Sequence, residues 1–152
     1  MSILPQVSID SDYSLCFGCG QNNPIGLKLH FQWDGKTATA QFIPTELYQG
    51  WPVLVHGGII ICLLDEAMSY AALFEGKACV TAKIQAKLRR PASINEPLLI
   101  TSSVTRKTKK LFESQATISL KDGTLIAEGV ATQFLVPPPS RDDKLNSNTR
   151  KK

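Results

Sequence analysis

The order of apolar and polar residues along the 152-residue chain predicts strands on both sides of one long helix. Apolar side chains occupy every second position in residues 27–33 and again in residues 80–88, which is the period of a strand with one covered face. Asp34-Gly35 is a typical hairpin turn between two such strands. The remaining strands are expected at residues 36–43, 98–106, 111–120 and 124–135.

Residues 55–74 have apolar side chains on nearly all sides, which is typical of a helix that is covered over most of its surface. Glu75-Gly76-Lys77 provides a C-terminal stop. The last four strands follow one another after hairpin-length connections, so we expect them to pair antiparallel. An antiparallel sheet curled around one helix is an α+β architecture.

Length and composition predict a single soluble domain. We place an N-terminal segment at residues 1–13, the folded domain at 14–137 and a disordered polar tail at 138–152. The start of the chain lacks the pattern of a secretion signal, and the longest apolar run, 59–64, is too short to span a bilayer. With four cysteines expected to be reduced, these features indicate a cytoplasmic protein that does not enter membranes.

The formal charge of +4 does not point to nucleic-acid binding. Residues 141–152 hold five basic residues and two aspartates, so +3 of this charge belongs to the tail and only +1 to the other 140 residues. We therefore expect the folded part to have no nucleic-acid partner.

The chemistry lies at the start of the predicted helix. His56 is followed by Gly57 and Gly58, whose amides have no partner inside the helix and stand in its favourable dipole for negative charge. No Ser, Thr, Asp or Asn precedes them as a cap, so they are available to stabilise an oxyanion. Asp65 and Glu66 follow about two turns later, and either could activate water or attack a carbonyl. The alternative is a structural His and an acid that faces solvent or pairs with a lysine.

A second motif is the Cys-x-x-Cys formed by Cys16 and Cys19. A structural zinc site needs four ligands. The chain has no second Cys-x-x-Cys and no His pair, because His30 and His56 are its only histidines. We therefore expect no metal here.

Three segments together resemble a known family: CFGCGQNNPIGLKLHF (16–31), HGGIIICLLDEAM (56–68) and VTAKIQAKLRRP (80–91). They are similar to hotdog-fold acyl-CoA thioesterases of the phenylacetate-degradation type, over roughly residues 16–135. The resemblance implies a long helix inside a curved antiparallel sheet, and homodimers that often pair again into dimers of dimers. It also implies active sites at the dimer interface, acyl-CoA as substrate, and no cofactor.

The resemblance implies a role for each matching residue. Asp65, nine residues after His56, matches the acidic base or nucleophile, and Gly57 matches the oxyanion-hole amide. His56 matches the residue that orients the site. Thr81 matches a position where a hydroxyl holds the attacking water. Glu66 is the second choice of acid, because related hotdog enzymes use Glu.

Further positions are expected to contact the substrate. Gly58 permits close approach to the helix start, while Arg89 and Arg90 end a strand where they could meet the phosphates of coenzyme A. The chain departs from the family at Gly50, where some members have an Asn that contacts the thioester. Gln49 could supply an amide beside it, or the contact is missing.

The leading interpretation is hydrolysis of an acyl-CoA thioester to a free acid and coenzyme A. The departure at Gly50 keeps a non-catalytic acyl-CoA-binding protein open as an alternative. An enoyl-CoA hydratase-type hotdog is the third, less favoured alternative, since a histidine at a helix start suits that chemistry poorly.

Overall fold

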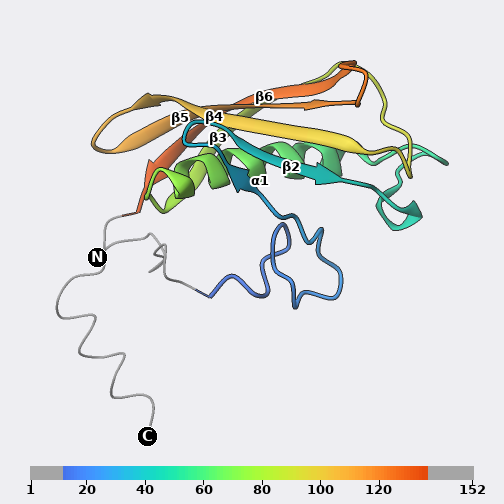
Figure 1. Cartoon of the computed structure of the whole chain (residues 1–152), viewed down its shortest axis with the longest axis horizontal. Coiled ribbons are helices and arrows are strands. Elements are labelled where there is room, and N and C mark those ends of the chain that lie inside the picture. Colours follow the sequence, from blue (N-terminus) through green and yellow to red (C-terminus); the bar gives the residue numbers. More distant parts are fainter. Residues whose placement is uncertain (1–11, 137–152) are drawn as a thin grey trace, which may run out of the picture.

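The computed structural model describes residues 12–136, which form one antiparallel sheet with one long helix on its face (Figure 1). The sheet order is β1-β2-β4-β5-β6-β3. The elements are β1 (Gln32–Trp33), β2 (Ala38–Phe42), the 3-10 helix η1 (Glu46–Tyr48), α1 (Gly57–Phe74), β3 (Cys79–Leu88), β4 (Leu98–Lys107), β5 (Leu111–Ser119) and β6 (Leu125–Leu135). The α+β class is confirmed. The predicted tail at 138–152 lies outside the described residues, as does most of the segment 1–13.

The apolar surface of α1 is explained by its packing. Leu63, Leu64 and Met68 are fully buried and form one core with sheet residues such as Ile100 and Ile118. The helix has the length and mean hydropathy, 1.5, of a membrane span. Those properties are accounted for here by the sheet that covers it, because buried core helices have the same composition.

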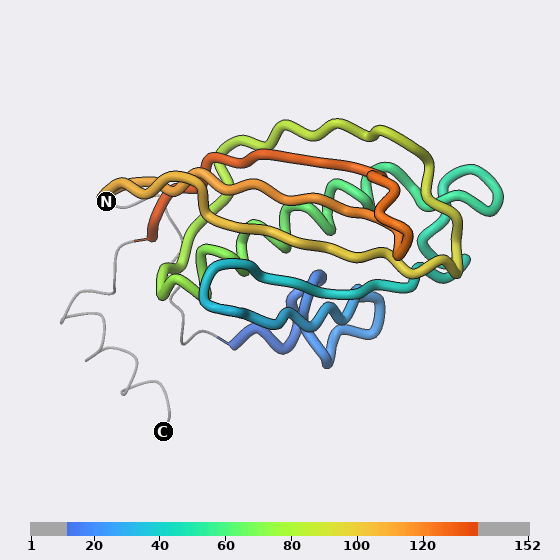
Figure 2. Tube along the Cα trace, turned by 45° about the horizontal axis from the view of Figure 1, so that its top comes forward, coloured from blue at the N-terminus to red at the C-terminus, as the bar shows by residue number. Residues whose placement is uncertain are grey.

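One predicted pairing is wrong. β3 and β4 do not form a hairpin: β3 lies at the edge of the sheet and pairs only with β6 among the described strands, while β4 lies between β2 and β5 (Figure 2). The connection, residues 89–97, crosses the start of α1 instead. Val55 N–H donates to Ala92 O at 2.8 Å, and Ile94 N–H donates to Val53 O at 3.0 Å. These bonds fix the segment that leads into the helix.

The first predicted strand is shorter than its pattern suggested. Leu27, Leu29 and Phe31 are buried as expected, but only Gln32–Trp33 belongs to the sheet. Leu27 and Leu29 donate their N–H groups to the carbonyls of Phe17 and Gly18, so this segment pairs with the preceding loop. The alternation of apolar and polar residues in 27–33 therefore predicted burial correctly and strand pairing incorrectly.

Candidate functional site

The start of α1 is capped by its own histidine. His56 is the N-cap residue, and its Nδ1 accepts a hydrogen bond of 2.9 Å from Gly58 N–H. Because Nδ1 acts as an acceptor, the ring proton of the neutral imidazole lies on Nε2. The expectation that no side chain caps this end is therefore wrong, and the Gly58 amide is not available to a substrate. A Cβ at Gly58 would lie 3.0 Å from Nδ1, so the absence of a side chain serves this cap.

The Gly57 amide is different. Within residues 12–136, its N–H group donates no hydrogen bond. It is the first residue of the helix, where an amide has no intrahelical partner. A surface pocket lies beside it, lined by Gly50, Trp51, Leu54, Val55, His56, Gly57 and Pro91. The structure thus leaves one helix-start amide, rather than two, next to a pocket.

Gln49 and Gly50 shape the loop before this pocket. The side-chain oxygen of Gln49 accepts a hydrogen bond from Val53 N–H at 3.3 Å, so that oxygen holds the loop. Gly50 lies against His56: a Cβ there would be 3.2 Å from His56 Cα and 3.3 Å from Cδ2 of the ring. A side chain at position 50 would press on the capping histidine, which gives a physical reason for glycine at this departure.

Asp65 lies on the side of α1 that faces β3. Thr81 Oγ1 donates a hydrogen bond of 2.7 Å to Asp65 Oδ1, and both side chains are half-buried. The strand register shifts between Thr81 and Lys83, leaving Ala82 without a partner on β6. A bulge of this kind turns the preceding side chain to the other face. Without it, Thr81 would lie on the opposite face from Ile84, which packs into the core.

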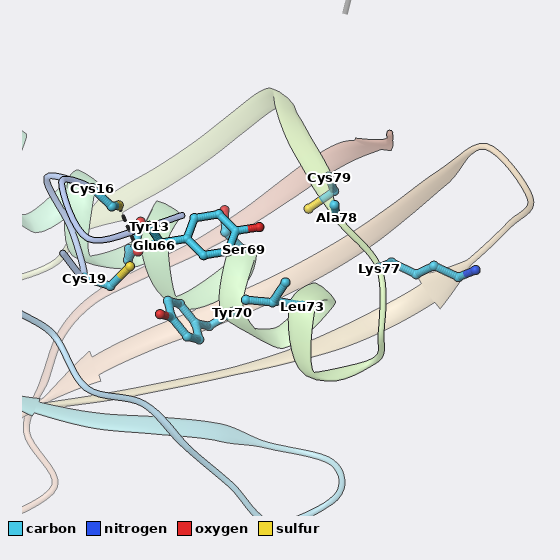
Figure 3. A pocket seen from close by; sticks show the side chains of 10 residues that line it. All are labelled: Tyr13, Cys16, Cys19, Glu66, Ser69, Tyr70, Leu73, Lys77, Ala78 and Cys79. Carbon is cyan, nitrogen blue, oxygen red and sulfur yellow. Dashed lines mark hydrogen bonds between the residues drawn. The ribbon is translucent and has the colours of Figure 1, made fainter. Parts of the chain in front are cut away.

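Glu66 points to a different part of the molecule. Cys16 Sγ donates to Glu66 Oε1 at 3.7 Å, and a Cβ at Gly18 would lie only 2.4 Å from Glu66 Cδ. Burial raises the pKa of the Glu66 carboxyl above its usual value, although the hydrogen bonds with Cys19 and Cys16 act in the opposite direction. The N-terminal loop therefore covers Glu66 (Figure 3). Asp65 instead lies beside the edge strand β3, where Thr81 contacts it. The two acids, equivalent in the sequence, have distinct surroundings.

Gly57 and Asp65 are not brought together within one chain. They are eight residues apart on the same helix, and a rise of 1.5 Å per residue separates them by about 12 Å along its axis. One thioester carbonyl cannot contact both.

Comparison with known proteins identifies the fold. A sequence model of the thioesterase superfamily matches residues 54–127, from the loop before α1 into β6. A thioesterase superfamily protein designated RHA08564 is 23% identical with a TM-score of 0.75, covering 89% of this chain and 69% of its own. The chain has the hotdog fold of the thioesterase superfamily. The fold implied by the sequence is thereby confirmed, and the family match agrees with the resemblance.

Two further hotdog structures are similar to this one. The PaaI protein of the E. coli phenylacetic acid degradation operon is 20% identical with a TM-score of 0.68, over 73% of this chain and 81% of that protein. A hypothetical thioesterase from Streptococcus pneumoniae TIGR4, solved with coenzyme A, is 13% identical with a TM-score of 0.69, over 74% and 91%. Two other structures of that protein carry single alanine substitutions, of a threonine and of an aspartate. No curated protein gives a significant sequence match.

Arg89 and Arg90 directly follow β3, near the start of α1, and are exposed. Arg89 pairs with Glu128 at 2.8 Å, so its guanidinium already has a carboxylate partner. The N–H groups of both Arg89 and Arg90 donate to Ile126 O, which holds their backbone against β6. Arg90 forms no ion pair within residues 12–136, although local hydrogen bonds and its positive charge together lower the pKa of the Asp122 carboxyl.

Two contacts of the site were missed in the sequence. One is the helix cap formed by His56. The sequence indicated it by a histidine, whose ring nitrogen can accept a hydrogen bond, directly before two glycines. The other is the meeting of Cys16 and Cys19 with Glu66, 50 and 47 positions away in the chain. No local pattern signals a contact over that distance.

Proposed function

We propose that the protein hydrolyses an acyl-CoA thioester to a carboxylic acid and free coenzyme A, with Asp65 as the acting acid. The observation that carries this proposal is the Thr81–Asp65 hydrogen bond, which holds the carboxylate in one orientation beside the edge strand. Thr81 occupies one oxygen, Oδ1, and leaves Oδ2 for a water molecule. Glu66 is covered by the N-terminal loop and does not suit this role.

The superfamily relatives support the proposal. The S. pneumoniae thioesterase has been crystallised with coenzyme A, and the threonine and aspartate replaced in its variants lie 16 residues apart. Asp65 and Thr81 have the same separation. This shared spacing favours an Asp–Thr pair with the same task in both chains.

A complete site needs two copies of the chain. Because about 12 Å of helix separates Gly57 from Asp65, we propose that the Gly57 amide of one copy faces Asp65 of the other. The edge strand β3 has no buried residue and no further strand beside it in the described part of the chain. A second β3 could pair there and extend the sheet, which would bring the two helices together in opposite directions.

The chemistry then follows from the positions of these groups. Asp65 Oδ2 accepts a proton from water while the water oxygen bonds to the thioester carbon. The carbonyl oxygen becomes an oxyanion and accepts a hydrogen bond from Gly57 N–H, a kind of contact worth roughly 2.7–4 kcal/mol. When the oxyanion collapses, the C–S bond breaks and the coenzyme A sulfur takes the proton from Asp65. Direct attack by Asp65 would instead break the C–S bond, release coenzyme A as its thiolate and form a mixed anhydride. Water would then cleave the anhydride to the free acid and Asp65.

Thiol release from acyl-CoA esters tests the proposal. The wild type and Asp65→Asn would be compared on short-chain, long-chain and aryl esters, with Asp122→Asn, an exposed turn aspartate, as the control. We expect Asp65→Asn to lose at least about 100-fold in kcat and Asp122→Asn to keep it. Wild-type turnover by Asp65→Asn would refute the assignment.

A second function is favoured by Gly50, which removes one contact to the thioester that the resemblance implies. On this hypothesis the protein binds acyl-CoA without cleaving it. Calorimetry would then detect binding of an ester by the wild type, while no thiol is released from any member of the panel.

A further inference from the structure

The cluster formed by Cys16, Cys19 and Glu66 lies outside the proposed hydrolytic site. One sulfur from each cysteine and one oxygen of Glu66 all lie within 4.8 Å of one another. The cysteines belong to the loop that precedes β1, and Glu66 extends toward them from α1 (Figure 3). The sequence motif alone offers two ligands, Cys16 and Cys19. The fold supplies a third.

The loop is shaped to bring these groups together. Gly20 N–H donates to Cys16 O at 2.8 Å, and Asn22 N–H donates to Ser14 O at 3.0 Å, closing a tight turn around the two cysteines. A Cβ at Gly20 would lie 2.5 Å from the backbone of Cys16, and a Cβ at Gly18 would overlap the Glu66 side chain. The backbone can therefore approach Glu66 only because both positions are glycine.

Without a bound ion, the polar atoms of this cluster are poorly satisfied, because they have only their own protons to share. Glu66 is half-buried, and its side chain accepts hydrogen bonds from thiols, which are weak donors. Two sulfurs and one carboxylate oxygen form a donor set that suits Zn²⁺. A dication would replace the protons on these groups and neutralise most of the charge of two thiolates and a carboxylate.

A fourth position is open beside the cluster. A mainly apolar pocket lies against the three residues and is lined by Tyr13, Cys16, Cys19, Glu66, Ser69, Tyr70, Leu73, Lys77, Ala78 and Cys79. It provides room for a water molecule as the remaining ligand of a tetrahedral ion.

We propose that Cys16, Cys19 and Glu66 bind one Zn²⁺ ion. The ion ties the N-terminal loop to α1 at the residue next to Asp65. Three protein ligands and one water hold it, rather than the four protein ligands that are typical of purely structural sites. The inference does not depend on thioesterase activity, and its readouts are metal content, absorption and stability.

Two measurements test it on the full-length protein. The first is zinc content after expression with zinc and purification under reducing conditions without chelator, where we expect about one ion per chain. The second is titration of the metal-free wild type with Co²⁺, which should give thiolate-to-cobalt charge-transfer absorption and the intense visible bands of a tetrahedral site. The Co²⁺ titration needs no variant, so it does not depend on whether a mutant folds.

Matched variants identify the ligands. Cys16→Ser, Cys19→Ser and Glu66→Gln should each lower zinc affinity by at least about tenfold, and removal of zinc should lower Tm in the wild type but not in these variants. Cys62→Ser and Cys79→Ser should bind zinc as the wild type does. The proposal is overturned by reduced wild type that holds no zinc and gives no cobalt–thiolate absorption. Unchanged binding by Glu66→Gln would overturn the carboxylate's part in it.

Discussion

The hydroxyl of Thr81 donates a 2.7 Å hydrogen bond to Asp65 across the gap between β3 and α1. This contact exists because the chain bulges at Ala82 and turns Thr81 toward the helix. A threonine on the edge strand thus fixes the orientation of Asp65, the acid of the Asp65–Glu66 pair that the N-terminal loop does not cover.

Removing this hydroxyl should reduce turnover. Thr81→Val keeps the shape of the side chain, and the loss of a hydrogen bond to a charged group, about 1.5–3 kcal/mol, should lower kcat by roughly 10- to 100-fold. Thr81→Ser restores the hydroxyl and should recover most of the rate in thiol-release assays. Thr39→Val on β2 is the control. Full activity of Thr81→Val would show that the hydrogen bond has no catalytic part.

The Gly57 amide can be removed without removing the helix. Proline lacks an N–H group but suits the first helical position, and His56, at φ −59° and ψ 132°, has the backbone conformation favoured before proline. We expect Gly57→Pro to lose roughly 100- to 1,000-fold in kcat. Gly57→Ala keeps the amide and meets only the flexible tip of Leu88 at 3.3 Å, so it should stay active. Equal rates for the two variants would exclude the amide from the reaction.

The bulge in β3 and the order of the strands could not be predicted from the pattern of apolar and polar residues. The alternation in residues 80–88 identified β3 correctly, because burial of Ile84 and Ala86 follows the strand period. It assigned Thr81 to the wrong face, since a single unpaired residue inverts every side chain before it. The order of the strands in the sheet was likewise not readable from neighbouring residues. Residues 89–97 cross to β4 because their backbone forms hydrogen bonds with the segment before α1.

The placement of the candidate residues on one helix was predictable, because helix-start amides and an acid in an apolar helix have a recognisable spacing; their roles stay predictions. The different surroundings of Asp65 and Glu66 were not predictable. They depend on which acid the loop around Cys16 covers, and that contact spans 50 positions of the chain.

The cap from His56 should contribute to stability. Replacing a good N-cap acceptor by Ala costs about 1 kcal/mol, so His56→Ala should lower the free energy of unfolding by that amount in urea titrations. His56→Asn offers an alternative acceptor to the same helix start and should recover most of it. If His56→Ala were as stable as the wild type, the hydrogen bond to Gly58 would have no net effect.

The cysteines near Asp65 should react slowly at neutral pH. Burial, with the nearby Asp65 charge, raises the pKa of the Cys79 thiol from 9.0 to about 11. Because only the thiolate reacts, alkylation below pH 9 should be about 100-fold slower than in the denatured protein, and should accelerate until the pH reaches about 11. Mass spectrometry after iodoacetamide pulses measures this. Equal rates in the folded and denatured protein would contradict it.

The central claim is that two chains build each site, and complementation between two inactive variants tests it most directly. Asp65→Asn and Gly57→Pro chains, carrying different affinity tags, would be co-expressed and the doubly tagged species isolated for thiol-release assays. In a mixed dimer one site combines the intact Gly57 of the first chain with the intact Asp65 of the second. We predict that an unfractionated equal mixture recovers about one quarter of wild-type turnover, and the purified hybrid about one half. A purified hybrid as inactive as either parent would contradict the account.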